Sequence, residues 1–414
     1  MKEFLKIENI QWEGRSYEYP KKRKIIEKLK KEIKNKLIIS IEGPRRVGKS
    51  VLMRQLIDYL IKNGELPVDI LYHSFDEYYE DPLGIIKEYE RIRGKSLREG
   101  KIYFFFDEIQ KIKEWQKYCK VIYDNYPNSK IVISGSTLRG SKKENLAGRM
   151  IEFFIKPLSF EEYLDFSERG SVLKTGLEDG ILEDYNFYLF RQYPDLILDK
   201  NINPREYVSG IIKKVIFEDS ILYLENPNKE LLHSLIKIIL RDPGQIMGYT
   251  DLAKDFGSDR KTISEYLEFL IKSSLVRRVY NYSNNARKTE TKAKKFYPFC
   301  TTLAGYIELE AKMDKIIETD VAFQIDAEFF YNERNEEIDF IIKNGNVKGI
   351  EVKYRNIVDR RDVKNLYSQS AKKIGITKRY LIVKENSRID IEKKDLKIIK
   401  YYLVWKNDEI TKKK

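Results

Sequence analysis

Short apolar runs alternate with helix-spaced segments through the first part of the chain. Five such runs occupy residues 37–41, 68–75, 101–106, 130–133 and 151–155. Their length and their β-branched or aromatic content are typical of buried strands. Between them, segments such as residues 51–57 place apolar side chains three and four positions apart, as an amphipathic helix does. Strands that alternate with helices predict a parallel sheet covered by helices, so the expected fold class is α/β.

The pattern becomes helical in the middle of the chain. Residues 157–228 carry helix-spaced apolar positions that glycines interrupt. Residues 229–282 contain three further helix-length segments; Gly257 ends the second, and Ser258 is expected to cap the third. A β-like run at residues 276–280 follows them. Three helices and a strand at this spacing predict a winged helix-turn-helix.

Strand-like runs return from about residue 300. Four of them cover residues 327–332, 337–342, 349–354 and 379–383. A helix is expected between about residues 358 and 373. These elements predict a small mixed sheet, which keeps the whole chain in the α/β class.

Cysteine and histidine usage narrows the chemistry. The chain contains Cys119, Cys300, His73 and His233 and no other cysteine or histidine. Because the two cysteines lie far apart, a zinc cluster is excluded, and two histidines make multi-histidine catalysis improbable. The chain has no apolar run of membrane-spanning length, and its first residues lack the apolar core of a signal peptide. These features predict a cytoplasmic protein without a membrane partner.

The charge balance is strongly basic. A formal net charge of +13 favours a polyanionic partner such as a nucleic acid. A chain rich in lysine and glutamate is also typical of thermophile surfaces, where charges form ion-pair networks. Charge by itself therefore leaves nucleic-acid binding open.

A glycine-rich loop follows the first strand-like run and leads into the first long helix. Residues 43–50 match the pattern G-x-x-x-x-G-K-[ST] in the strand–loop–helix context of a phosphate-binding loop. Glycines let backbone N–H groups turn around an anion, and the helix N-terminus adds partial positive charge. We expect Lys49 to reach the β- and γ-phosphates of ATP and Ser50 to hold Mg²⁺. The predicted nucleotide-contacting residues are Gly43, Pro44, Arg45, Arg46, Val47, Gly48, Lys49, Ser50 and Val51.

Two carboxylates end the third strand-like run. We expect Asp107 to bind Mg²⁺ through its water shell and Glu108 to polarise the attacking water. The next run ends in Ser134-Gly135-Ser136, and Ser134 or Ser136 either senses the γ-phosphate or forms a simple cap. Arg149, further on, either stabilises transition-state charge or forms an ordinary ion pair.

These motifs resemble those of the archaeal and bacterial AAA-type ATPases, which are similar to the signal-transducing (STAND-like) P-loop NTPases. The resemblance rests on residues 43–50, 106–110, 134–136, 146–149 and 157–164. It implies a P-loop ATPase core and a winged-helix segment. Many members of that family also end in a domain similar to the PD-(D/E)xK restriction-type nucleases, so the resemblance implies such a domain here.

The pattern and the resemblance together predict four parts. They are a P-loop ATPase core at residues 1–165, a helical lid at 166–228, a winged helix-turn-helix with a basic linker at 229–298, and a nuclease-like domain at 299–414. The expected architecture is a parallel P-loop sheet with a helical lid and winged helix, followed by a small restriction-endonuclease-like α/β domain.

The nuclease resemblance rests on Asp339 and the pair Glu351-x-Lys353 in neighbouring strand-like runs. Because side chains alternate along a strand, Glu351 and Lys353 share a face, which Asp339 can join. Two carboxylates can hold Mg²⁺, and Lys353 can position or deprotonate a water. Glu318 matches the additional helical glutamate of that family as a further metal ligand, whereas Ile338 replaces its leading proline. The alternative is an inherited scaffold that cleaves nothing.

Basic residues gather around the predicted winged helix. Its third helix presents Arg260 and Lys261, which could meet phosphates or base edges, but Glu265 and Glu268 disfavour sequence-specific readout. A basic tract suited to non-specific DNA contact comprises Arg277, Arg278, Arg287, Lys288, Lys292, Lys294 and Lys295. The alternative is a winged helix that acts as a lid or contacts proteins.

The leading hypothesis is an ATPase that requires Mg²⁺ and works as a switch or motor on DNA, with cleavage by the nuclease-like domain as an additional activity. The alternative is a signalling ATPase whose winged helix and C-terminal domain bind proteins and have no nuclease activity. Assembly into a homo-oligomer is left open.

Overall fold

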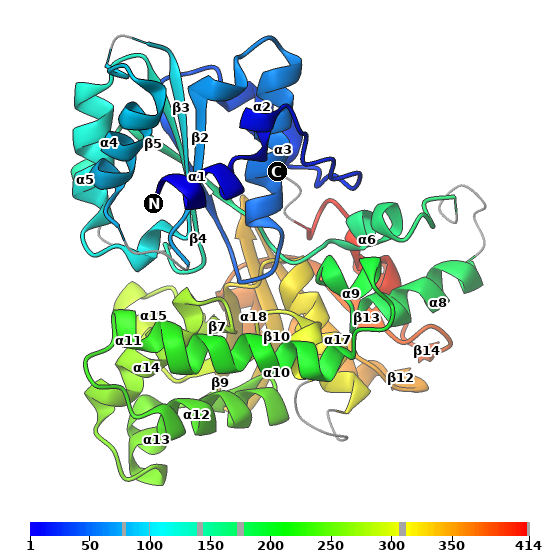
Figure 1. The fold of residues 1–414 in the computed structure, drawn as a ribbon. Helices are drawn as coiled ribbons and strands as arrows, with labels where there is room; N and C mark the ends of the chain where they lie inside the picture. Colours follow the sequence, from blue (N-terminus) through cyan, green and yellow to red (C-terminus); the bar gives the residue numbers. More distant parts are fainter. Residues whose placement is uncertain (77–79, 99, 139–143, 172–177, 306–311, 412–414) are drawn as a thin grey trace. The chain divides into compact units, whose positions relative to one another are not determined.

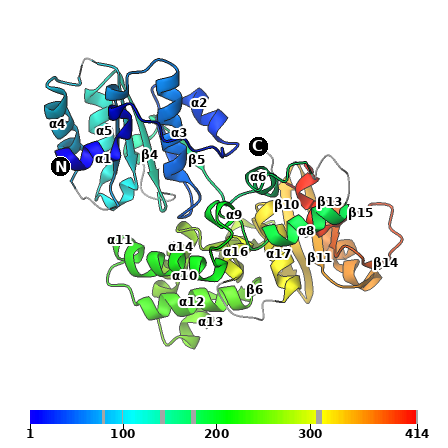
Figure 2. The same ribbon diagram turned by 45° about the vertical axis from the view of Figure 1, so that its right-hand side comes forward.

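A computed structural model describes residues 1–76, 80–98, 100–138, 144–171, 178–305 and 312–411 of the protein. Contacts within the chain form two compact units, Met1–Leu158 (unit 1) and Ser159–Lys414 (unit 2), whose elements are shown in Figures 1 and 2.

Unit 1 is built on a parallel sheet of five strands. The strands are β1 (Ile38–Glu42), β2 (Ile70–Ser74), β3 (Ile102–Asp107), β4 (Ser129–Gly135) and β5 (Met150–Phe154). The helices are α1 (Lys2–Glu8), α2 (Ile26–Glu32), α3 (Lys49–Lys62), α4 (Pro82–Arg93) and α5 (Trp115–Asn125). Short 3₁₀ turns are η1 (Ile10–Glu13), η2 (Pro67–Asp69), η3 (Ile109–Lys111) and η4 (Glu144–Leu146). Helices α4 and α5 lie on one face of the sheet and α3 on the other (Figure 1). The predicted α/β class is confirmed.

The strand order is β2-β3-β4-β1-β5. Strand β1 lies between β4 and β5 and is parallel to both, with Ile41 aligned to Ser134 and Phe153. Because all five strands run in one direction, the ends of β1, β3 and β4 lie at one edge of the sheet. Ligands of open α/β sheets bind at this carboxyl edge.

The N-terminal residues cover the outer edge of β2. The side-chain amide of Asn9 donates to the carbonyl of Tyr72 at 2.8 Å and accepts from its N–H at 2.7 Å. The indole N–H of Trp12 donates to the carbonyl of Ile70 at 2.9 Å. These side chains satisfy backbone groups that an open edge strand leaves unpaired.

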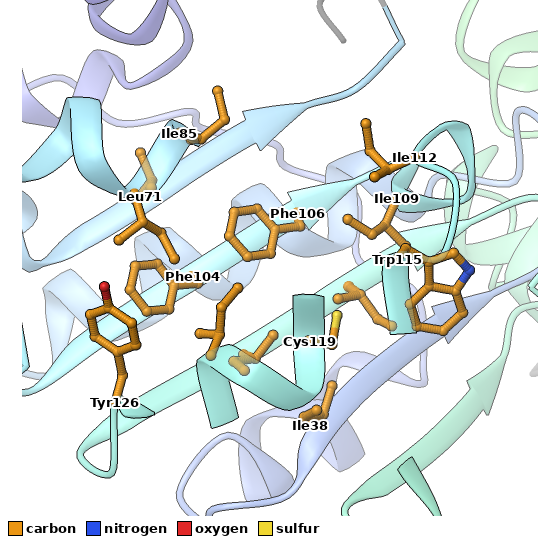
Figure 3. Close-up of a cluster of buried hydrophobic side chains, with 14 of the residues drawn as sticks. Ile38, Leu71, Ile85, Phe104, Phe106, Ile109, Ile112, Trp115, Cys119 and Tyr126 are labelled. Atoms are coloured by element: carbon orange, nitrogen blue, oxygen red, sulfur yellow. The ribbon is translucent and has the colours of Figure 1, made fainter. Parts of the chain in front are cut away.

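The core between the sheet and α4–α5 is aromatic. The rings of Phe104 and Phe106 stack with centroids 5.8 Å apart, and both are fully buried. Trp115 and Cys119 approach them from α5, as Figure 3 shows. The alternation of β3 side chains thus sends two phenylalanines to one face of the sheet.

Unit 2 contains the helical middle of the chain and a second sheet. Its helices are α6 (Phe160–Phe166), α8 (Glu178–Tyr188), α9 (Asp195–Leu198), α10 (Pro204–Lys214), α11 (Ser220–Tyr223), α12 (Lys229–Arg241), α13 (Tyr249–Asp255), α14 (Arg260–Lys272), α15 (Ala286–Thr291), α16 (Thr301–Ala304), α17 (Met313–Gln324) and α18 (Gln369–Lys373). A π-helical turn, η5 (Val215–Asp219), joins α10 to α11, and 3₁₀ turns are η6 (Arg360–Tyr367) and η7 (Tyr401–Lys406).

The main sheet of unit 2 has eight strands in the order β15-β13-β11-β10-β9-β7-β8-β6. They are β6 (Gln245–Met247), β7 (Val276–Asn281), β8 (Lys294–Pro298), β9 (Phe329–Glu333), β10 (Glu336–Asn344), β11 (Asn346–Lys353), β13 (Ile376–Val383) and β15 (Leu396–Lys400). Strands β12 (Ile357–Asp359) and β14 (Arg388–Asp390) form a separate pair. The hairpin β7–β8 after α14 therefore shares a sheet with the C-terminal strands, through the pairing of β7 with β9.

Two local predictions in unit 2 are wrong. Asp259 rather than Ser258 caps α14, because its carboxylate accepts from the N–H groups of Lys261 and Thr262. The single helix expected at residues 358–373 is instead a strand, a 3₁₀ turn and the short α18. Ser368 causes the break, since its extended backbone and its hydroxyl cap a new helix.

The aromatic core of unit 1 gives a stability prediction. Phe104→Ala removes a fully buried ring from the sheet and should lower the free energy of unfolding of unit 1 by about 3–5 kcal/mol. Chemical denaturation followed by circular dichroism measures this. Val121→Ala, on a 41% exposed residue of α5, is the control and should change stability by less than about 0.5 kcal/mol. Equal effects would contradict the assignment of the core.

Candidate functional site

The glycine-rich loop connects the end of β1 to the start of α3. Gly43 has φ of +149°, and a Cβ at this position would collide with the carbonyl oxygen of Ile155 in the chain beside it. Gly48 has φ of +93° and precedes Lys49, the first residue of α3. The backbone conformation therefore requires glycine at both positions. The loop between them lies at the carboxyl edge of the sheet and ends at the N-terminus of α3, which suits an anion.

The side chain of Lys49 lies inside the loop. It is only 4% exposed, and its Nζ donates to the carbonyls of Gly43 at 3.1 Å and Pro44 at 2.9 Å. The same atom lies 3.6 Å from Oε1 of Glu108. The loop thus holds a buried cation beside the carboxylate of Glu108, the residue that follows β3.

Asp107 ends β3 and is 2% exposed. Its Oδ2 accepts from the hydroxyl of Tyr72 at 2.7 Å, and its Oδ1 accepts from the hydroxyl of Ser134 and from the N–H of Glu108 at 3.1 Å. Burial and the charge of Asp107 raise the pKa of Tyr72 well above its ordinary value, so this hydroxyl stays a donor. Three donors fix the carboxylate in one orientation.

Glu108 follows with φ of +51°, which turns its side chain toward the loop. Burial alone would raise its pKa, but Lys49, Arg45 and a hydrogen bond from Gln110 together lower the pKa below its ordinary value. The carboxylate is therefore ionised at neutral pH, as a group that polarises water must be.

Gln110 connects Glu108 to the end of β4. Its amide nitrogen donates to the carboxylate of Glu108 and, at 3.2 Å, to the hydroxyl of Ser136. A Cβ on Gly135 would collide with the amide oxygen of Gln110, which explains the glycine between the two serines. The motif at residues 106–110 includes Gln110 but predicts no role for it, and Tyr72, a tyrosine in a strand, belongs to no motif.

The predicted residues of this site fall into two groups. The loop residues, Asp107, Glu108 and Ser134 converge at the carboxyl edge of the sheet, and Ser134 contacts Asp107. Arg149 does not join them, because it precedes β5 and so lies at the opposite edge, where its carbonyl accepts from the N–H of Ile38. Its guanidinium lies 3.6 Å from Asp124 and over the ring of Tyr123. Of the two alternatives for Arg149, the structure supports the ordinary ion pair.

The side chains at this site are suitable ligands for Mg²⁺. The carboxylate of Asp107 is buried and pre-oriented, and Ser50 opens α3 beside Lys49, so the available ligands are oxygens. When bound with the nucleotide, the ion would supply positive charge to the phosphates.

A second cluster of charged groups lies on β10 and β11 of unit 2. The Nζ of Lys353 lies 3.2 Å from Asp339 and 2.7 Å from Glu351, and the N–H of Val352 donates to Asp339 at 2.8 Å. Against the effect of burial, Lys353 and Lys295 lower the pKa of Asp339 to about 2, whereas burial and Asp339 raise the pKa of Glu351 well above its ordinary value. The structure thus brings together the three residues that the strand alternation predicted.

Glu318 is held by other partners. Its Oε1 accepts from the hydroxyl of Tyr297 at 2.7 Å, and the Nζ of Lys295 lies 3.5 Å away. Lys295, 2% exposed on β8, also lies 2.7 Å from Glu337. Within the described ranges, no group of three or more Asp, Glu, His or Cys residues is arranged to hold a metal ion. Glu318 therefore does not form a metal site with Asp339 and Glu351. It pairs instead with the buried Lys295.

Sequence comparisons identify part of this architecture. A family model described as an AAA domain matches residues 35–164, and two domains of unknown function, DUF8612 and DUF4143, match residues 182–312 and 318–403. Together with the parallel sheet and its phosphate-binding loop, the first match makes unit 1 an AAA-type P-loop ATPase domain. Among the described residues, no helix has the length and apolarity to cross a membrane.

Two similar proteins are uncharacterised. An uncharacterised protein of Haemophilus influenzae is 29% identical over 267 residues, which are 62% of this chain and 66% of that protein. An uncharacterised protein of Methanocaldococcus jannaschii is 27% identical over 364 residues, 81% of this chain and 79% of its own. Solved structures of Thermotoga maritima RuvB variants, 15–16% identical, cover 67% of this chain and 90% of theirs, with TM-scores of 0.31–0.33.

The loop lysine can be tested directly. Lys49→Ala removes the cation that faces the predicted phosphate position and should weaken binding of a fluorescent ATP analogue about 10- to 100-fold. Lys62→Ala, an exposed residue at the other end of α3, should leave the affinity unchanged. Thermal unfolding of both variants checks the fold. Unchanged ATP affinity in the Lys49 variant would refute the assignment of the loop.

Proposed function

We propose that the protein hydrolyses ATP with Mg²⁺ and uses the nucleotide cycle as a switch or motor that acts on DNA. The observation that carries the proposal is the meeting of Lys49, Asp107 and Glu108 at the carboxyl edge of the sheet. A buried cation, an oriented carboxylate and an ionised carboxylate provide phosphate binding, a metal ligand and a group that polarises water.

Exposed cations on unit 2 support DNA as the partner. Arg260 and Lys261 are exposed at the start of α14, and Arg287 and Lys288 are exposed on α15. Glu268 pairs with Arg278, which removes one of the two charges expected to repel a phosphate backbone. Phosphate contacts by such side chains give sequence-independent affinity.

The basic tract predicted for DNA contact is smaller than the sequence suggested. Arg277, Lys294 and Lys295 are buried, and Arg277 pairs with Asp326 at 2.7 Å. Lys294 and Lys295 are neighbours in β8 and point to opposite faces, but both faces of this strand are covered. Lys294 donates to the carbonyls of Glu290 and Lys292, and Lys295 pairs with Glu318 and Glu337. The proposal therefore rests on the cations of α14 and α15.

Salt dependence tests the DNA partner. The double variant Arg260→Ala/Lys261→Ala should weaken binding to a DNA duplex and reduce the slope of log K against log salt by about 2, since two phosphate contacts are lost. Lys372→Ala/Lys373→Ala, which removes two exposed charges from α18, should leave the slope unchanged. ATP hydrolysis without any salt-dependent DNA affinity would favour the signalling ATPase instead.

Phosphodiester cleavage by unit 2 is a second candidate function. Asp339, Glu351 and Lys353 form a compact cluster, and Oε1 of Glu351 is buried without a hydrogen-bond partner. An unsatisfied carboxylate oxygen beside a second carboxylate fits a divalent cation, which would supply Lewis-acid activation when bound. Lys353 holds both carboxylates in place and can orient a water toward a phosphate.

Cleavage is tested with plasmid and linear DNA in Mg²⁺ or Mn²⁺. Asp339→Asn, which keeps the shape of the side chain, should reduce any cleavage at least about 100-fold, because the ionised carboxylate is lost. Asp390→Asn, on the exposed strand β14, is the control and should cut at the wild-type rate. Cleavage that survives in the Asp339 variant would refute this site.

A further inference from the structure

The carboxylate of Asp107 is held by a residue outside the phosphate-binding motifs. Tyr72 on β2 is fully buried, and its hydroxyl donates to Oδ2 at 2.7 Å. Strands β2 and β3 are parallel with Tyr72 aligned to Phe105 and Ser74 aligned to Asp107. Because side chains two residues apart share a face, Tyr72 and Asp107 lie on the same face of the sheet. The hydroxyl therefore reaches the carboxylate from within a rigid strand.

Arg54 contacts the other side of Tyr72. It lies on α3, the helix that Lys49 and Ser50 begin, and its guanidinium stands 5.1 Å from the ring centroid of Tyr72. The same guanidinium stands 5.5 Å from the ring of Tyr17, and its Nη1 donates to the hydroxyl of Tyr19 at 3.1 Å. Arg54 thus sits between two tyrosine faces, one from the sheet and one from the N-terminal segment.

The N-terminal segment is anchored to the same helix. The N–H groups of Tyr17 and Glu18 donate to the carboxylate of Asp58 at 3.1 and 3.2 Å, and the hydroxyl of Tyr17 donates to the carbonyl of Glu8 at 2.8 Å. Contacts therefore run without a gap from the N-terminal segment through Arg54 and Tyr72 to Asp107.

We propose that Tyr72 is a positioning residue for Asp107, and that Arg54 makes this positioning depend on the N-terminal segment around Tyr17. The inference rests on the proposed use of ATP with Mg²⁺. Donor groups that orient a metal ligand set its affinity for the ion even though they do not touch the ion. A cation between two aromatic faces adds a modest stabilisation, which fits a residue that supports the primary contact.

Tyr72→Phe removes one hydroxyl and keeps the ring in its place. The Mg²⁺ concentration that gives half-maximal tightening of a fluorescent ADP analogue should rise about tenfold, and so should the Mg²⁺ requirement of ATP hydrolysis. Affinity for the analogue without Mg²⁺ should stay at the wild-type value, because Lys49 and the loop are intact. Tyr103→Phe, a nearly buried tyrosine at the start of β3 near Lys101 and Glu65, is the matched control and should change neither quantity.

Arg54→Met tests the link to the N-terminal segment. It removes the charge and keeps most of the side-chain volume. The Mg²⁺ concentration required for ATP hydrolysis should therefore rise about 2- to 5-fold. The melting temperature should stay close to that of the Tyr72→Phe protein. An unchanged Mg²⁺ requirement in the Tyr72 variant would overturn the positioning role, and an unchanged requirement in the Arg54 variant would overturn the link. If the wild-type protein itself shows no Mg²⁺-dependent nucleotide binding, the proposed function fails instead.

Discussion

The candidate nucleotide site depends on the contacts of the Lys49 ammonium group, which is enclosed by the carbonyls of Gly43 and Pro44 and faces Glu108. A nearly buried amine stays charged only when oxygens surround it. Here the loop backbone supplies two of them and the end of β3 supplies a carboxylate. The same charge keeps the pKa of Glu108 low despite its burial. One cation therefore links the conformation of the loop to the ionisation of the neighbouring carboxylate.

The cluster in unit 2 follows the same physical rule with a different outcome. Lys353 lies between two nearly buried carboxyl groups. Because two negative charges this close together repel each other, the pKa of Asp339 is lowered while the pKa of Glu351 is raised. Lys295 adds a second buried cation that pairs with Glu318 and Glu337. A ligand of this cluster must compete with two lysines, whereas in unit 1 the lysine lies inside the glycine-rich loop, where the phosphates are expected.

The sequence predicted features that depend on local order along the chain. The phosphate-binding loop and the Asp107-Glu108 pair follow apolar runs, so strand direction alone places them at one edge of the sheet. Alternation along β11 likewise placed Glu351 and Lys353 on one face. Features that depend on tertiary contacts or on the side that a residue faces could not be predicted from the sequence. Arg149 precedes the run at residues 151–155, so strand direction already places it at the opposite edge, but its ion pair with Asp124 is a tertiary contact. Lys295 points into the protein from a tract that looks like a solvated surface. Tyr72 acts through a contact between neighbouring strands, and Gln110, although it belongs to the motif at residues 106–110, acts through a contact with Ser136 that the motif does not predict.

The proposed function requires that nucleotide state controls contact with DNA. The most direct measurement is the affinity of the Glu108→Gln protein for a DNA duplex, by fluorescence anisotropy at fixed salt, with ATP, with ADP and without nucleotide. This substitution leaves Lys49 and Asp107 in place, so ATP should bind and stay unhydrolysed. We expect the affinities with ATP and ADP to differ about tenfold, within the usual range of coupling between two sites. Equal DNA affinity in all three states, with nucleotide binding demonstrated in the same samples, would show that nucleotide state does not control contact with DNA.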